Sequence, residues 1–283
     1  MLRLGHAPET QLSLRTYRTV ADLLYKHSRI YLGNDKQALL THRLRHRLPQ
    51  LGLKSYNQYC ALLLSRDGMD EIEHLVDFLS TNHTFFFREP EAFSFLTTRI
   101  LPELIPQLLS SFSPLRIWSA AASSGEEPYT IALALTEALR AFPLLDWKVT
   151  ASDISHRMLA RAQKGIYSMK SVNPVPLDLL RRHFQKGIGI HAGNFRVKAA
   201  LRQRVLFEHI NLFQFPYPFA HEQHVIFCRN VMIYFDQPSR AVLVDKLVQN
   251  LTPGGYLILG LSESLFGLHH NLESIQQGVY RRR

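Results

Sequence analysis

The chain has little cysteine and no long apolar run, and both absences narrow its class. Cys60 and Cys228 are the two cysteines among 283 residues, and they lie far apart without metal-ligand spacing. We therefore expect a reducing compartment rather than a disulfide framework. No apolar run reaches the roughly 18 residues that span a bilayer. The start, MLRLGHAPETQLSLRTYR, also lacks the sustained apolar region of a signal peptide.

Acidic residues are also in the minority. Lysine and arginine number 33 against 23 aspartates and glutamates, which gives a formal net charge of +10. This balance favours an acidic partner, and nucleic acid, an anionic membrane surface and an acidic protein all remain candidates. Hydrophobic residues make up 46% of the chain, enough for a packed core, so composition excludes a disordered protein.

The first part of the chain shows helical patterns and no strand pattern. Leu40, Leu44 and Leu48 recur at i, i+4 and i+8, which predicts an amphipathic helix. A second, basic face of that helix comprises Arg43, His46 and Arg47, flanked by Arg45. We predict a small helical domain, with its linker, over residues 1–90.

From residue 115 onward, strand patterns alternate with helical ones. This alternation predicts an α/β fold with a doubly wound, mostly parallel sheet, in a second domain over residues 91–283. The strand patterns are LRIWSAA, DWKVTASDI, RVLFEHINL, HVIFCRNVMIYF and GGYLILGL. Residues 166–204 break the alternation with glycines and short β-like runs, which predicts a small inserted antiparallel β-subdomain.

The loop after the first strand lacks the glycines of a dinucleotide site. IWSAAASSGEEPYTIALAL has small residues but a single glycine, so the G-x-G-x-x-G pattern is absent. Two glutamates stand where a phosphate cradle would need positive charge. Pro128 suits the first helical position, which makes Glu127 the helix cap and leaves Glu126 to face a ligand. The alternative is that both glutamates only complement the helix dipole.

Asp153 ends the second strand, at the place where nucleotide-binding sheets hold ribose hydroxyls with an acidic residue. Its alternative role is to cap the next helix. The site thus combines a loop that lets a ligand approach the backbone closely, two carboxylates and an acid placed for ribose, and it has no phosphate cradle. This combination fits S-adenosylmethionine. That molecule is an adenosine without phosphate that carries a sulfonium, an ammonium and a carboxylate group.

Four segments closely resemble the chemotaxis receptor methyltransferases, the CheR family. They are TNHTFFFREPEAF, RIWSAAASSGEEPYTIALAL, ASDISHRMLARAQKGIY and IFCRNVMIYFDQPSR. The resemblance implies an N-terminal helical domain and a class I, Rossmann-like S-adenosylmethionine-dependent methyltransferase domain with an inserted antiparallel β-subdomain. It further implies methyl transfer to glutamate carboxylates of membrane chemoreceptors in sensory adaptation. The products are glutamate methyl esters and S-adenosylhomocysteine, and no metal is expected.

The resemblance also implies roles for individual residues. Glu126, with Glu127 as runner-up, is expected to meet the cofactor ammonium group, and Asp153 the ribose. The expected cofactor-binding set is Asn82, Thr84, Arg88, Glu126, Glu127, Asp153, Asn211, Leu212, Arg229 and Asn230. The expected catalytic set is Arg88, Arg229 and Tyr234. A free glutamate is already ionised at neutral pH, so no general base is expected.

The expected partner is the cytoplasmic domain of chemoreceptors, with the protein in the cytoplasm and recruited to receptor clusters. Arg43, Arg45, His46 and Arg47 would dock on glutamate-rich receptor helices; a merely solvated face is the alternative. GIGIHAGNF resembles members whose subdomain binds a receptor C-terminal peptide by strand addition. Neither nucleic-acid binding nor membrane insertion is expected. The rival hypotheses are methylation of RNA by the same fold and a non-catalytic docking module.

Overall fold

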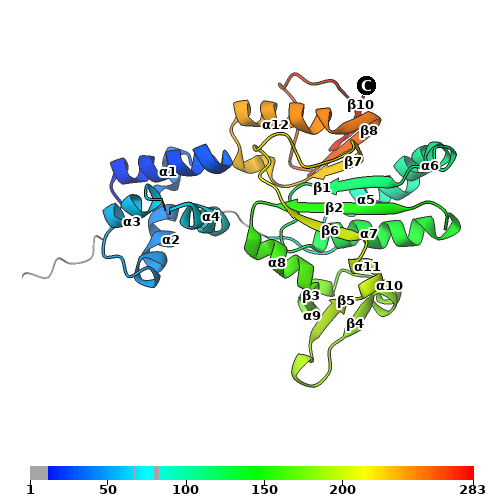
Figure 1. The fold of residues 1–283 in the computed structure, drawn as a ribbon, viewed down its shortest axis with the longest axis horizontal. Helices are drawn as coiled ribbons and strands as arrows, with labels where there is room; N and C mark the ends of the chain where they lie inside the picture. The colour runs from blue at the N-terminus through cyan, green and yellow to red at the C-terminus, as the bar shows by residue number, and fades with distance from the viewer. Residues whose placement is uncertain (1–11, 67, 80–82) are drawn as a thin grey trace, which may run out of the picture. The chain divides into compact units, whose positions relative to one another are not determined.

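The computed structural model describes residues 12–66, 68–79 and 83–283, which fall into two compact units. One unit comprises residues up to 81 together with 234–236, and the other comprises 82–233 and 237–283. The predicted fold class is confirmed: the first unit is helical, and the second has a mostly parallel sheet and a small antiparallel one (Figure 1). No helix in the described ranges is long and apolar enough to cross a bilayer.

The larger unit is built on a seven-stranded sheet of order β6-β2-β1-β7-β8-β10-β9. All its neighbouring pairs from β6 to β8 are parallel, whereas β10 is antiparallel to both β8 and β9. The strands are β1 (Leu115–Ser119), β2 (Trp147–Asp153), β6 (Val205–His209), β7 (Gln223–Cys228), β8 (Leu251–Leu259), β9 (Leu272–Gln276) and β10 (Val279–Arg282). The central strands are buried along their length, which explains their near-continuous apolar runs.

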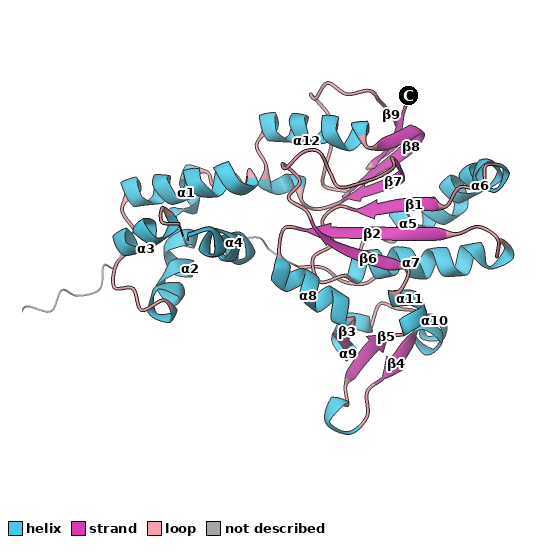
Figure 2. Cartoon of the chain, viewed as in Figure 1, coloured by secondary structure: helices cyan, strands magenta, loops and turns pink. Residues whose placement is uncertain are grey.

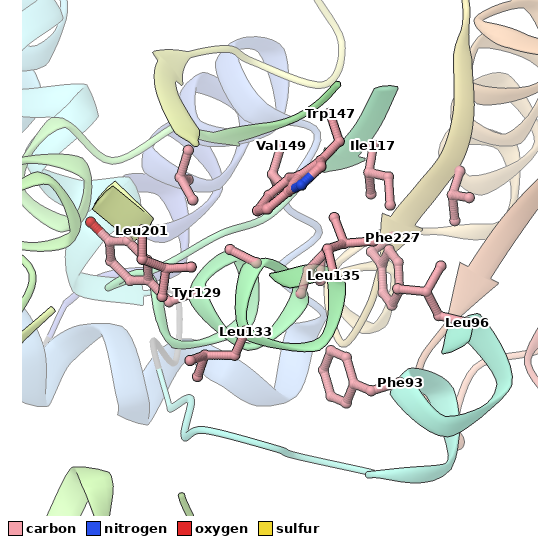
Figure 3. Close-up of a cluster of buried hydrophobic side chains, with 14 of the residues drawn as sticks. Phe93, Leu96, Ile117, Tyr129, Leu133, Leu135, Trp147, Val149, Leu201 and Phe227 are labelled. Carbon is pink, nitrogen blue, oxygen red and sulfur yellow. The ribbon is translucent and has the colours of Figure 1, made fainter. Parts of the chain in front are cut away.

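Helices pack on this sheet, and the main hydrophobic core lies between helices and strands. The helices are α5 (Glu91–Phe95), the π-helix η2 (Leu96–Ile100), α6 (Leu101–Ser110), α7 (Glu126–Ala138), η3 (Leu139–Ala141), α8 (His156–Lys164), α11 (Ala199–Arg202), η5 (Met232–Tyr234) and α12 (Gln237–Gln249). Figure 3 shows this core: α7 contributes Tyr129, Leu133 and Leu135, the strands contribute Ile117 and Val149, and the α5–η2 segment contributes Phe93 and Leu96. Alternation along β1 sends Ile117 to this core and Trp118 to the other face, against Tyr217 and Phe219.

The predicted inserted subdomain is a three-stranded antiparallel sheet of order β3-β5-β4, set apart from the large sheet (Figure 2). Its elements are β3 (Ile166–Ser168), α9 (Met169–Val172), α10 (Leu177–His183), β4 (Phe184–Lys186), η4 (Gly189–His191) and β5 (Asn194–Val197). Tyr167, Phe184 and Phe195 are buried beneath it. Phe86 makes edge-on contacts with Tyr167 and Phe184, which ties the subdomain to the segment before α5.

The N-terminal unit contains α1 (Leu14–Ser28), η1 (Asn34–Lys36), α2 (Gln37–Gln50), α3 (Tyr56–Leu63) and α4 (Gly68–Leu79). Leu40, Leu44 and Leu48 of α2 are buried, as their spacing predicts. A side-chain cap begins α3, because Ser55 Oγ accepts a hydrogen bond from Gln58 N.

One residue of the predicted basic face is part of this unit's interior packing. Arg47 donates from Nη2 to Glu71 Oε2 at 2.6 Å and from Nε to Glu71 Oε1 at 3.1 Å. Tyr59 Oη donates to the same carboxylate at 2.9 Å, and Glu71 is 6% exposed. The hydrogen bond and charge of Glu71 raise the pKa of Arg47. Arg47 therefore holds α2 against α4, whatever else it contacts.

We expect Glu71→Ala to lower the free energy of unfolding of the N-terminal unit by about 3 kcal/mol, since it leaves a partly buried guanidinium and a buried phenol without their acceptor. Urea unfolding followed by far-ultraviolet circular dichroism measures the loss. Asp70→Ala is the matched control, because Asp70 is exposed on the same helix and its removal should cost less than about 1 kcal/mol. Equal losses in the two variants would contradict a structural role for the Arg47–Glu71 pair.

Candidate active site

A topological switch point places the site at the carboxyl ends of β1 and β7. The chain runs from β1 outward to β2 and then β6, and it returns on the opposite side of β1 as β7 and β8. Loops from neighbouring strands therefore diverge between β1 and β7, which is where open α/β sheets bind their ligands. The predicted residues Glu126, Asp153 and Asn230 lie at or just after the ends of strands at this edge.

The loop after β1 brings its backbone close to the neighbouring elements. Ser123 and Gly125 have left-handed φ values of 47° and 95°. A Cβ on Gly125 would lie 2.8 Å from both Ala162 Cβ and Tyr167 Oη, so no larger residue fits. The prediction that Glu127 caps the helix is wrong: Gly125 occupies the cap and α7 begins at Glu126. Pro128 is tolerated in the first turn because amides there have no intrahelical acceptor.

Asp153 fixes the shape of this loop. Its Oδ2 accepts a hydrogen bond from Ser123 N at 2.8 Å, and its Oδ1 accepts one from Ser155 N at 2.9 Å. The alternative role as a helix cap belongs to Ser155 instead, whose Oγ accepts from Met158 N at 3.0 Å. Asp153 thus joins the ends of β1 and β2 at the position expected for ribose.

Glu126 is a buried carboxylate, 2% exposed. Ser124 Oγ donates to its Oε2 at 2.7 Å, and no cation in the described ranges forms an ion pair with it. Burial raises the pKa of Glu126, although the Ser124 hydrogen bond and the more distant Arg161 charge oppose the rise. A buried acid of this kind suits a cationic ligand, such as an ammonium group.

Glu127 has a different environment, although it is adjacent in sequence. Its Oε1 accepts from Ser119 Oγ at 2.8 Å and its Oε2 accepts from Arg229 Nη1 at 2.9 Å. Burial raises the pKa of Glu127, and the Arg229 guanidinium opposes the rise. The structure therefore separates the two glutamates: Glu127 has an internal cation and Glu126 has none among the described residues.

Arg229 is the centre of a buried ion cluster. Its side chain is 1% exposed, and Nη2 donates to Glu89 Oε2 at 2.9 Å and to the Arg88 carbonyl at 2.7 Å. Together with the Glu127 contact, these bonds occupy both terminal nitrogens, while Nε has no hydrogen-bond partner. The expectation that Arg229 meets the reacting atoms is therefore not what this geometry favours, because its donors are directed into the protein.

Glu89 is the residue of this cluster that sequence reasoning missed. Its Oε2 also accepts from Leu261 N at 3.0 Å, and its Oε1 accepts from Asn230 Nδ2 at 3.3 Å. Burial alone would raise the pKa of Glu89, but the hydrogen bonds from Arg229, Leu261 and Asn230 and the Arg229 charge hold that pKa below its usual value. A glutamate beside Arg88, directly before Pro90, was the available signal.

Arg88 lies between two residues with left-handed backbone, Phe87 at φ 57° and Glu89 at φ 55°. Its guanidinium is partly exposed and donates from Nη1 to the His83 carbonyl at 2.9 Å. It therefore has further donors for a ligand carboxylate. Thr84, near it in sequence, is half-buried, whereas Asn82 lies outside the described residues.

A second missed carboxylate, Glu263, holds the ends of β7 and β8 together. It accepts hydrogen bonds from the backbone amides of Asn230, Met232 and Gly260 at 2.7, 2.8 and 2.9 Å. Its signal was a glutamate two residues after the GGYLILGL strand pattern. On the β6 side, Asn211 and Leu212 are buried just beyond the strand end, and Asn211 Oδ1 accepts from Phe213 N at 3.0 Å.

Comparison with known proteins decides the family. The profile of "CheR methyltransferase, SAM binding domain" matches residues 82–281, and that of "CheR methyltransferase, all-alpha domain" matches residues 15–80. The chain belongs to the CheR methyltransferase family. It is 40% identical to chemotaxis protein methyltransferase 2 of Pseudomonas aeruginosa over 93% of this chain and 91% of that protein. It is 36% identical to the chemotaxis protein methyltransferase of Salmonella typhimurium, over 95% and 90% of the two chains.

A solved structure, TrmN from Thermus thermophilus, aligns with a TM-score of 0.36 and 18% identity, over 66% of this chain and 46% of that one.

The match to both CheR domains and the near full-length relatives confirm the predicted activity class. The protein is an S-adenosylmethionine-dependent chemotaxis protein methyltransferase.

Two groups of predicted CheR residues lie in the N-terminal unit. Tyr234 ends η5 and is half-buried, and its carbonyl accepts from Tyr31 N at 2.8 Å. On α2, Arg45 and His46 are exposed, and the guanidinium of Arg43 lies 5.6 Å from the centre of the Phe78 ring. The roles predicted for these residues stay predictions.

Glu126→Gln should have opposite effects on stability and on cofactor binding. Because burial raises the pKa of Glu126 in the folded state, the folded protein gains stability as pH falls through that pKa and is penalised for the ionised form at neutral pH. The uncharged amide removes this penalty, so the midpoint of thermal unfolding without ligand should rise at pH 7. Affinity for S-adenosylmethionine should fall at least tenfold, because a charge-assisted bond to the ammonium group is lost.

Calorimetry measures both quantities, and Glu273→Gln, on the exposed face of β9, is the control that should change neither. A lower unfolding midpoint in Glu126→Gln, with unchanged affinity, would show that Glu126 is a structural acid and not a ligand-binding one.

Proposed function

We propose that this CheR protein transfers the methyl group of S-adenosylmethionine to glutamate side chains of membrane chemoreceptors. The products are glutamate methyl esters and S-adenosylhomocysteine. The observation that carries the cofactor half of the proposal is the buried carboxylate of Glu126, which has no ion-pair partner among the described residues. It lies next to the loop 120–125, which Asp153 holds through the Ser123 amide. The acceptor half rests on the family, whose relatives are chemotaxis protein methyltransferases over nearly their whole length.

In this proposal the two ends of the cofactor are held by different elements. Glu126 binds the ammonium group, since Glu127 is already paired with Arg229. Arg88 binds the methionyl carboxylate with the donors that the His83 carbonyl leaves available. Asp153 binds the ribose, and Asn211 and Leu212 border the adenine. Thr84 supplies a neutral hydrogen bond to the cofactor, and the family motif assigns the same role to Asn82, which lies outside the described residues.

The chemistry needs alignment more than acid–base help. S-adenosylmethionine supplies an electrophilic methyl group on a positive sulfur. The acceptor glutamate is ionised at neutral pH and attacks that methyl directly, in line with the sulfur. A guanidinium clamped to this carboxylate would weaken it as a nucleophile. Two carboxylates and a carbonyl occupy the terminal nitrogens of Arg229, so we assign Arg229 to positioning. Tyr234 is assigned, from the family motif, to the passage of the methyl group.

Receptor recognition is assigned to two basic surfaces. On α2, Arg43, Arg45 and His46 face acidic receptor helices, whereas Arg47 acts mainly by holding α2 in place. In the subdomain, residues 166–204 carry eight lysines and arginines against one aspartate, a net charge of +7. A groove of about 340 Å³ there is lined by Ile166, Ile188, Phe195, Lys186 and Arg196, among others. Its apolar and basic lining suits a receptor C-terminal peptide added beside a strand.

The test of the proposal is methyl transfer to a receptor. Purified protein is mixed with S-adenosylmethionine labelled in its methyl group and a chemoreceptor cytoplasmic fragment, and the protein product is treated with mild alkali. Labelled methanol released from the receptor is the expected result, because carboxyl methyl esters are cleaved by alkali. Receptor that stays unlabelled while S-adenosylmethionine is bound, or label transferred to RNA supplied in place of the receptor in a parallel reaction, would overturn the acceptor assignment.

We expect Arg43→Gln with Arg45→Gln to raise the KM for the receptor fragment about tenfold, while the Kd for S-adenosylmethionine stays unchanged. The two arginine charges attract an acidic receptor helix, and salt screens that attraction. The difference in KM between the double variant and the unaltered protein should therefore shrink as salt is added. Lys54→Gln is the matched control, an exposed cation beyond the end of α2. An unchanged KM in the double variant would show that α2 is not part of the receptor-binding surface. A parallel loss of cofactor affinity would indicate misfolding.

A further inference from the structure

The side-chain amide of Asn230 has an orientation that its surroundings dictate. Asn230 Nδ2 lies 3.3 Å from Glu89 Oε1, and Glu89 also accepts from Arg229 and Leu261. Hydrogen bonds and the Arg229 charge keep the pKa of Glu89 low, so this carboxylate is ionised and can only accept. The amide must therefore present its NH₂ group to Glu89 and its oxygen to the other side.

The backbone around Asn230 leaves little freedom for another arrangement. Asn230 has a left-handed φ of 58°, and its N–H is held by Glu263 Oε2 at 2.7 Å. Gly260 packs against the amide: a Cβ at Gly260 would lie 2.6 Å from Asn230 Nδ2. Glu263 holds Gly260 N as well, so one carboxylate fixes both sides of this contact.

The oxygen of this amide is an open acceptor. Within the described part of the chain no donor is hydrogen-bonded to Asn230 Oδ1, and the residue is half-buried. Asn230 follows β7, whereas Asp153 ends β2 on the other side of β1. A ligand whose ribose meets Asp153 therefore extends its non-nucleoside part across β1 towards Asn230. An amide oxygen there attracts a positively charged sulfonium and the polarised C–H groups of its methyl. It makes no comparable favourable contact with the neutral thioether of the product.

We propose that Asn230 discriminates between cofactor and product, and that Glu89 is the positioning residue that makes it do so. Asn230 Oδ1 faces the sulfonium and its methyl group, which favours the positively charged S-adenosylmethionine over neutral S-adenosylhomocysteine and so helps the product to leave. Glu89 holds the NH₂ end and keeps the oxygen on the ligand side. This inference rests on the proposed function, because it requires S-adenosylmethionine as the ligand.

The ratio of two dissociation constants tests the inference. Calorimetry gives the Kd of S-adenosylhomocysteine divided by that of S-adenosylmethionine, a ratio that general damage to the site leaves unchanged. Asn230→Ala should lower this ratio about three- to tenfold, as expected for a weak charge-assisted contact, mainly by weakening S-adenosylmethionine. Glu89→Gln should lower it in the same direction, because a glutamine can also donate and no longer dictates which end of the amide faces it.

Glu103→Gln is the matched control, since Glu103 pairs with Tyr256 and Arg281 and has no contact with Asn230. It should leave the ratio unchanged. Equal weakening of both ligands in Asn230→Ala, with an unchanged ratio, would overturn the proposed discrimination while leaving the methyltransferase assignment intact. A wild-type protein that binds neither ligand would instead overturn the proposed function itself. A lowered ratio in Asn230→Ala but not in Glu89→Gln would remove the positioning role of Glu89.

Discussion

The guanidinium of Arg229, buried at the carboxyl end of β7, is the interaction on which the rest of the site depends. It binds Glu127 at the start of α7 and Glu89 in the segment before α5, and so joins three parts of the chain. A buried charge is costly unless its partners are well placed, and removal of one partner leaves the others unpaired. The cluster therefore fixes the position of Arg88: Arg229 binds its carbonyl, and Glu89 Oε1 lies 3.9 Å from its Nε.

Together with Arg229, the buried carboxylates of the site also hold backbone that would otherwise relax. Phe87, Glu89, Ser123 and Asn230 all adopt left-handed φ values, although none is a glycine. Each such residue costs of the order of 1–3 kcal/mol, and such conformations persist only where the surrounding contacts enforce them. Here the enforcing contacts are Asp153 on the Ser123 amide, Glu263 on the Asn230 amide and Arg229 on Glu89. These buried acids thus act chiefly on geometry, whereas the side chain of Glu126 is bonded to Ser124 Oγ and does not hold any of these four residues.

Sequence reasoning succeeded where the signal was local. The alternation of strands and helices, the inserted antiparallel segment and the position of Asp153 at a strand end all follow from short-range patterns. Prediction was incomplete where interacting residues are distant in sequence. Glu89 and Arg229 are 140 residues apart, and Arg47 and Glu71 are 24 residues apart. The local sequence around either residue therefore does not indicate its partner. The helix cap was misjudged for another reason: the prediction weighed the pre-proline preference of Glu127, while the close approach of Ala162 and Tyr167 demanded Gly125.

Hydrogen exchange of the Arg229→Lys variant tests the central role of the Arg229 cluster most directly. Lysine keeps the charge but cannot bind Glu89, Glu127 and the Arg88 carbonyl together. If the cluster organises the site, the Leu261 amide, which is bonded to Glu89, should exchange much faster than in the unaltered protein. Amides of Ile117 and Val149 in the parallel strands should keep their protection. An unchanged rate at Leu261, or an equal loss of protection throughout the sheet, would contradict the account.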